Sequence, residues 1–182
     1  VKEALDKDIR LSCHAIGESA IEQITEVYGE LEGRIPTSGA MMRIDHFEFP
    51  SKKAVELIKK LPLAITVQPG FSWIDKHFLK SYEQFLPESI IARQLPLKDL
   101  MNSDVCVCGS SDSPVQSVNP YEQMLGMVDF YLQDQSITPY EALKTYTVNP
   151  AKMLGELNTG TLQKANDADL FICDRDILSC TG

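Results

Sequence analysis

The sequence predicts an α/β fold built from parallel strand–helix units. Short apolar runs alternate with helical segments at intervals of about 20–40 residues along the 182-residue chain. The runs are mostly apolar throughout, as strands are when helices cover both faces of a parallel sheet. Four such units are recognisable, whereas a closed barrel contains eight. The pattern therefore predicts half of a (β/α) barrel or a small open sheet.

Each expected element follows from a local pattern. Strands are expected where short apolar runs end at a turn or a helix, over residues 9–15, 41–47, 63–68 and 104–109. Helices are expected where apolar residues recur every three or four positions, over residues 18–31, 51–60, 98–102, 119–132 and 139–146. Ser51 is a favourable N-cap, and Pro139 suits the first turn of a helix.

Two segments depart from this alternation. Residues 71–96 are expected to be irregular, and the aromatic side chains within 71–85 either line a substrate pocket, which we favour, or cover the core. After Pro150 the chain becomes turn-rich, and residues 169–174 form a compact β run. We therefore expect a small β appendage at the C-terminus.

Composition excludes several classes of partner. A net charge of −9 and a pI near 4.8 argue against nucleic acid or an anionic membrane. No apolar run has the length of a membrane span, and no secretory signal is visible. Five cysteines without a CxxC pair favour a reduced, cytoplasmic protein with buried thiols. The start at Val1, which reads as the interior of a helix, suggests a chain cut from a longer one.

Three chemically useful residues occupy the same position in their units. His14 and His46 each close a strand-like run, and Asp112 follows the run 104–109 after Gly109 and two serines. In a (β/α) barrel these positions converge at the mouth formed by the strand ends. Two neutral imidazoles and a carboxylate are suitable ligands for a divalent metal, and the carboxylate can also serve as a base.

Each of these assignments has a structural alternative. A histidine at a strand end is often a hydrogen-bonded structural residue, and Asp112 could simply cap the turn at Ser113-Pro114. Glu18 either contacts His14 or faces the dipole of its own helix. Arg43 is expected to pair with a carboxylate below the site. The third histidine, His77, is expected at the surface or in a substrate loop.

Six motifs in a fixed order give the chain a family resemblance. They are His14-Ala-Ile-Gly-Glu-Ser-Ala, Arg43-Ile-Asp-His46, Val67-Gln-Pro-Gly70, Gly109-Ser-Ser-Asp112-Ser-Pro-Val, Ala142-Leu-Lys-Thr-Tyr-Thr-Val-Asn-Pro-Ala151 and Ala168-Asp-Leu-Phe-Ile-Cys-Asp174. This set resembles the amidohydrolase superfamily, in particular the family 3 branch with D-aminoacylase-like and N-substituted-formamide-deformylase-like hydrolases. The resemblance covers nearly the whole chain.

The resemblance implies a metal-dependent (β/α)8 or TIM barrel with one or two divalent ions, expected to be zinc. In it, His14 matches the metal ligand after strand five and His46 the ligand after strand six. Asp112 matches the aspartate after strand eight, which acts on the hydrolytic water and is counted among the metal ligands. Residues 1–155 would then be a barrel segment with about strands five to eight, and residues 156–182 part of a small β domain.

The chain also departs from the family pattern. The family opens with a His-x-His pair on its first strand, which this sequence lacks, and its strand-four lysine or carboxylate should precede Val1. The chain thus resembles the C-terminal half of a hydrolase of non-peptide C–N (amide or amidine-type) bonds in small molecules. The fragment alone is expected to be inactive and to self-associate through open sheet edges. The alternative is a non-catalytic remnant or a partner-binding pseudoenzyme of the same fold.

Overall fold

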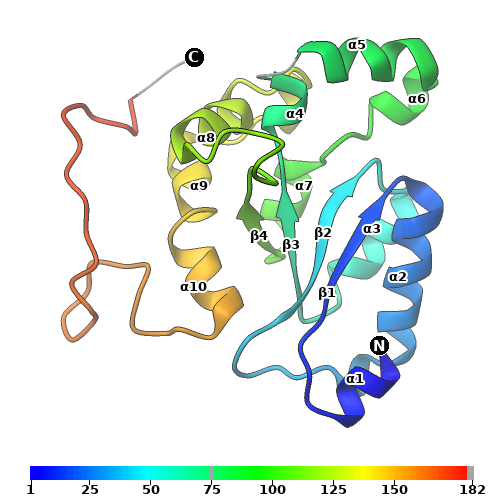
Figure 1. The fold of residues 1–182 in the computed structure, drawn as a ribbon, viewed down its shortest axis with the longest axis horizontal. Coiled ribbons are helices and arrows are strands. Elements are labelled where there is room, and N and C mark those ends of the chain that lie inside the picture. The colour runs from blue at the N-terminus through cyan, green and yellow to red at the C-terminus, as the bar shows by residue number, and fades with distance from the viewer. Residues whose placement is uncertain (74–75, 180–182) are drawn as a thin grey trace.

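A computed structural model describes residues 1–73 and 76–179 and contains a four-stranded parallel sheet (Figure 1). The strands lie side by side in chain order, so each strand is followed by a crossover to its neighbour. Their bounds are β1 Ser12–Ile16, β2 Met42–Glu48, β3 Leu63–Val67 and β4 Cys106–Gly109. All four strands expected from the sequence are present, and the predicted α/β class with the sheet of a partial barrel is confirmed.

Helices connect and cover these strands. The first group is α1 Lys2–Asp6, α2 Glu18–Glu30, the 3-10 turn η1 Glu32–Arg34 and α3 Lys52–Ile58. Between β3 and β4 lie α4 Gly70–Trp73, α5 Lys76–Phe85, α6 Glu88–Ile91 and α7 Leu97–Met101. After β4 come α8 Pro120–Val128, η2 Gln133–Gln135, α9 Pro139–Lys144 and α10 Val148–Leu154.

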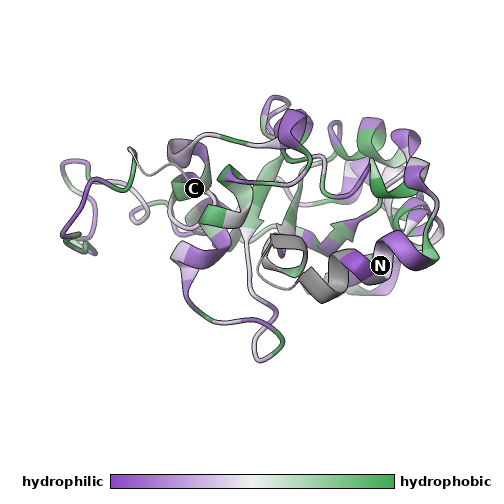
Figure 2. Cartoon of the chain, turned by 90° about the horizontal axis from the view of Figure 1, so that it is seen from above, coloured by the Kyte–Doolittle hydropathy of each residue, from purple (hydrophilic) through white to green (hydrophobic). Residues whose placement is uncertain are grey.

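The hydrophobic core lies between one face of the sheet and the helices. Ile44, Ile65 and Val107 come from three adjacent strands and are fully buried against helical side chains such as Ile21 and Ile58. Each such side chain contributes roughly 1.5–3 kcal/mol on burial. In Figure 2 both the strands and the surrounding helices carry green, apolar and purple, polar residues, as expected for elements with one buried face. The other face of the sheet is therefore the one available for a functional site.

Local capping explains where several helices begin. The backbone N–H of Ala54 donates to the Ser51 side chain at 3.1 Å, so Ser51 is the N-cap that the sequence predicts. At α9, Thr138 and Glu141 form a capping box and Pro139 occupies the first turn. The helix predicted over 139–146 ends at Lys144, and a separate helix, α10, follows.

The expectations for residues 71–96 and 169–174 are both wrong. Residues 71–96 are largely helical, because they form most of α4 and all of α5 and α6. The β run expected at 169–174 is not a strand, and the described part of 156–179 contains neither helix nor strand. No strand among the described residues lies beside it to complete a ladder. In Figure 1 this segment, orange to red, runs away from the sheet.

The two outer strands differ in how far their edges are covered. The Asn149 side chain donates to the Val107 carbonyl at 2.7 Å, and the Gly109 N–H donates to the Thr145 carbonyl at 2.9 Å. These contacts cover part of the β4 edge. Self-association through the sheet edges stays a prediction. Within the described residues, none of the helices combines the length and apolar character that a membrane crossing needs.

Candidate metal site at the strand ends

His14 and His46 meet at the C-terminal ends of neighbouring strands. Their ring centroids are 4.4 Å apart, and the rings form an edge-to-face pair with an interplanar angle of 71°. His14 belongs to β1 and is exposed, whereas His46 belongs to β2 and is only 7% exposed. The structure thus brings together the two histidines that the sequence selects.

A bulge in the sheet accounts for the position of His46. Ala15 pairs with His46 but Ile16 pairs with Glu48, so β2 carries one extra residue at this point. His46 has φ of 73° and Phe47 has φ of 51°, both in the left-handed region that L-residues rarely adopt. The irregular backbone interrupts the alternation of side chains along β2. His46 can therefore join His14 on the cavity side even though it directly follows Asp45.

One ring nitrogen of His46, Nδ1, is buried without a hydrogen-bond partner among the described residues. Gln68, directly after β3, lies within hydrogen-bonding reach of the same side chain. Burial, followed by repulsion from His14, lowers the pKa of His46, although Asp112 and Asp45 oppose this shift. The imidazole is consequently neutral at neutral pH, which is the form that binds metals.

Asp112 lies in the loop that follows β4. Its backbone is left-handed, with φ of 52°, and its N–H donates to the Ser110 hydroxyl at 3.3 Å. The following turn is closed by the backbone, since the Val115 N–H donates to the Asp112 carbonyl at 2.9 Å. Among the described residues the Asp112 carboxylate accepts no hydrogen bond. The turn-capping alternative therefore has no side-chain contact to support it.

The three residues line one cavity of about 580 Å³. Its wall also includes Gln68, the β4 residues Cys108 and Gly109, and Tyr146 from the connection between α9 and α10. Phe71 of α4 is parallel to the His46 ring, with centroids 6.5 Å apart. Among the described side chains of residues 71–85, Phe71 therefore lies beside His46, although it is not one of the residues that line the cavity. Tyr82 instead packs against Phe49, with ring centroids 4.9 Å apart.

The cavity does not hold a complete set of metal ligands. Across residues 1–73 and 76–179, no group of three or more His, Cys, Asp or Glu side chains is arranged to hold a metal ion. The available donors nevertheless suit one, because two imidazoles are in contact, one buried nitrogen is unpartnered and a carboxylate is free of hydrogen bonds. This combination is what the distal part of a larger metal site would present.

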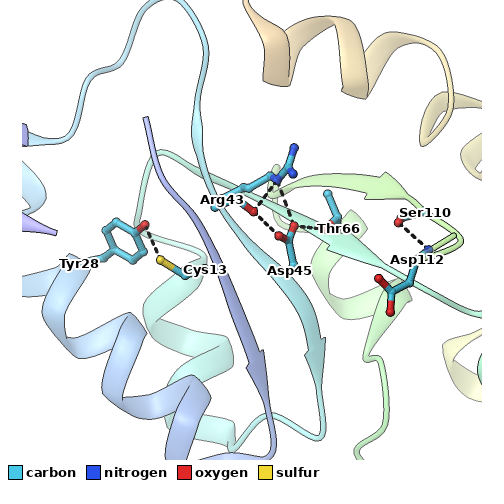
Figure 3. Close-up of polar contacts among 8 residues, drawn as sticks. Cys13, Tyr28, Arg43, Asp45, Thr66, Ser110 and Asp112 are labelled. Carbon is cyan, nitrogen blue, oxygen red and sulfur yellow. Dashed lines mark hydrogen bonds and ion pairs between the residues drawn. The ribbon is translucent and has the colours of Figure 1, made fainter. Parts of the chain in front are cut away.

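Beneath the histidines lies a polar cluster that sequence reasoning found only in part. Arg43 was expected to pair with a carboxylate, and its Nε lies 3.0 Å from Asp45 Oδ1. Figure 3 shows the contacts of Arg43 and Thr66 with Asp45. The hydroxyls of Ser12 and Thr66 also donate to Asp45. These partners come from three strands, so only the register of the sheet reveals the cluster. No sequence spacing could have indicated it.

Two other expectations have different outcomes. Glu18 forms an ion pair with Arg93, which lowers the pKa of its carboxyl, and it lies in the first turn of α2, as the helix-dipole alternative expects. The side chain of His77 falls outside the described part of the chain, as do those of Trp73 and Phe78. Gln68 lines the cavity as well, but the sequence analysis gave it no role of its own, although it lies in the motif Val67-Gln-Pro-Gly70.

Comparison with known proteins places this geometry in context. The model of the amidohydrolase family matches residues 1–181. The protein named amidohydrolase YtcJ of Bacillus subtilis is 24% identical over 187 residues, covering 97% of this chain and 34% of that protein. The N-substituted formamide deformylase of Arthrobacter pascens is 24% identical over 180 residues, covering 94% of this chain and 33% of that protein. The chain therefore spans about a third of the length of these relatives.

Solved structures give the same result for the fold. An uncharacterized metal-dependent hydrolase from Pyrococcus horikoshii superposes with a TM-score of 0.82 at 24% identity, over 98% of this chain and 36% of that one. Another from Pyrococcus furiosus has a TM-score of 0.82 at 25% identity, over 97% and 36% of the two chains. The described sheet and helices thus match one part of a larger fold.

Proposed function

The chain belongs to the amidohydrolase family, and on this basis we propose that it is the distal part of a metal-dependent hydrolase that cleaves non-peptide C–N bonds. His14 and His46 are the proposed metal ligands, and Asp112 is the proposed base and a further ligand. The observation that carries this proposal is the single cavity that holds all three, with Nδ1 of His46 buried and unpartnered.

The donor set favours a divalent metal, and zinc is the proposed identity. Neutral imidazole nitrogen and carboxylate oxygen are the donors that zinc accepts beside thiolate. When bound, such an ion polarises a water molecule and lowers its pKa. The chain contributes the imidazoles of His14 and His46 for binding, and Gln68 orients the His46 ring from the adjacent strand end.

Asp112 is the proposed proton carrier. Its carboxylate is exposed toward the cavity and accepts no hydrogen bond among the described residues, so its lone pairs are available. It would accept the proton of the attacking water and later donate it to the nitrogen that departs. The buried ring of Phe71 lies beside His46 and would keep bulk water away from that side of the imidazole.

The relatives support the bond type and the partial nature of the chain. One of them is named for removing formyl groups from N-substituted formamides, which is cleavage of a C–N bond. The relatives are about three times as long as this chain, which leaves room for the missing first-strand histidine pair. We infer a small amide-like substrate and a cytoplasmic location for the intact protein.

A substrate panel tests the proposed reaction. The intact protein that carries this chain, loaded with zinc, should hydrolyse N-formyl or N-acyl amines but not matched carboxylic or phosphate esters. Removal of the metal with a chelator should abolish the activity, and added zinc should restore it. Ester cleavage without amide cleavage, or hydrolysis that persists in the metal-free protein, would contradict the proposal.

A further inference from the structure

Asp45 gathers hydrogen-bond donors from three strands at the centre of the sheet. It accepts from Ser12 of β1 and Thr66 of β3, and it forms an ion pair with Arg43 of its own strand. Arg43 Nε also lies 2.9 Å from the Ser12 hydroxyl, so the contacts form a closed cluster. Figure 3 shows Arg43 and Thr66 converging on the Asp45 carboxylate.

This cluster adjoins the candidate metal site. In the sheet register His14 pairs with Asp45, and His46 is the next residue along β2. Arg43 and Asp45 line the same cavity as both histidines and Asp112. Their side chains are 37% and 24% exposed, so neither charge is fully screened by solvent.

An arginine in this position is unfavourable for cation binding. A guanidinium group remains charged at every relevant pH, so Arg43 would repel a divalent metal held by His14 and His46. The Asp45 carboxylate lies against Arg43 and cancels that charge. The hydroxyls of Ser12 and Thr66 hold the carboxylate in this place.

We propose that Asp45 is a positioning residue for the metal site, which acts by neutralising Arg43 in the cavity wall. The inference rests on the proposed metal-binding function and adds to it a residue that touches neither metal nor substrate. Asp45 has its oxygens occupied by three partners. It is therefore suited to charge compensation and poorly suited to ligating the metal itself.

A set of four variants separates this electrostatic role from a structural one. The affinity of the intact protein for zinc is measured by competition with a chromophoric chelator, and folding is followed by circular dichroism. Asp45→Asn preserves the shape but removes the charge, and should weaken zinc binding about 10- to 100-fold. Thr66→Val removes one of the hydrogen bonds that hold the Asp45 carboxylate but keeps its charge, so it should weaken zinc binding less than Asp45→Asn does.

The decisive variant removes both charges. Arg43→Gln/Asp45→Asn should recover the zinc affinity of the wild type, because no uncompensated cation remains. Arg43→Gln alone should bind zinc more tightly than the wild type, and this result tests the inference even where Asp45→Asn fails to fold.

Three results would overturn the role of Asp45. They are an Asp45→Asn variant with wild-type affinity, a double variant as weak as Asp45→Asn, and weaker binding by Arg43→Gln. Wild-type protein that binds no zinc would overturn the proposed function together with this inference. Normal wild-type binding combined with any of the three results would overturn this inference alone.

Discussion

His46 and its neighbours adopt a backbone that is costly for residues with side chains. His46, Phe47 and Phe49 all have positive φ, at 73°, 51° and 61°. Left-handed conformations cost roughly 1–2 kcal/mol per residue, and such strain concentrates at functional sites. Here the strained segment contains the bulge that brings His46 beside His14. The local cost is consistent with selection for the position of one imidazole.

The sequence predicted that three candidate residues converge at the strand ends, but not the backbone geometry that brings them there. His14, His46 and Asp112 could be predicted because each follows a short apolar run, and parallel strands end at the same edge of a sheet. The bulge and the positive φ of His46 depend on pairing between β1 and β2. The contacts that Gln68 and Asp45 make with neighbouring strands likewise depend on the register of the sheet.

A first prediction concerns the chemical role of Asp112. In the intact protein, Asp112→Asn should lower turnover by about 10²–10⁴-fold, because the amide cannot accept the proton of the water. The metal content should be largely preserved, since the two imidazoles remain. Metal analysis beside hydrolysis of an N-formyl or N-acyl amine measures both quantities.

Ser110→Ala is the matched control for this experiment. It removes the hydroxyl that accepts from the Asp112 N–H but leaves the carboxylate intact, so activity should stay close to that of the wild type. Full activity in Asp112→Asn would show that the base is another group. The turn-capping interpretation of Asp112 would then replace the catalytic one.

Among the secondary-structure elements, the two outer strands are expected to decide whether the isolated chain self-associates. Asn149 and Thr145 occupy part of the β4 edge, whereas the outer edge of β1 ends at Ile16, which is 41% exposed. Unpaired strand edges with apolar side chains favour association. We expect the isolated chain to self-associate or to be poorly stable, and light scattering over a range of concentrations measures this.

A variant with a lysine on the exposed edge of β1 can be compared with the original chain. Ile16→Lys places a charge at the end of β1 and should shift the isolated chain toward smaller species, as edge lysines do in natural sheets. A compact, stable monomer at every concentration, for the original chain as well as the variant, would argue against association through this edge.

The strands were easier to predict than the helices between β3 and β4. A short, nearly continuous apolar run such as Leu63–Val67 predicts a buried parallel strand, and every residue of this run is indeed buried. The α5 segment was interpreted as irregular because of its many aromatics, although its apolar residues follow helical spacing. These are Phe78, Leu79, Tyr82, Phe85 and Leu86. The β run at 169–174 fails for another reason, since a strand needs a partner that this part of the structure does not provide.

The chain contains the sheet of a partial barrel, and in our proposal it also carries part of a metal site. It matches about a third of the length of its relatives, and within the described residues no three His, Cys, Asp or Glu side chains are arranged to hold a metal ion. Both observations have the same explanation if the remaining strands and the first-strand histidine pair lie elsewhere in the intact protein. We therefore propose that His14 and His46 belong to a metal site completed by the rest of the intact protein.

The metal content of histidine variants of the intact protein tests that claim most directly. Zinc per protein molecule is measured by elemental analysis for the wild type, His14→Ala, His46→Ala and His77→Ala, each confirmed to be folded. We predict that His14→Ala and His46→Ala lose bound zinc, whereas His77→Ala, the third histidine of the chain, retains the wild-type content. Wild-type zinc content in both His14→Ala and His46→Ala would contradict the account.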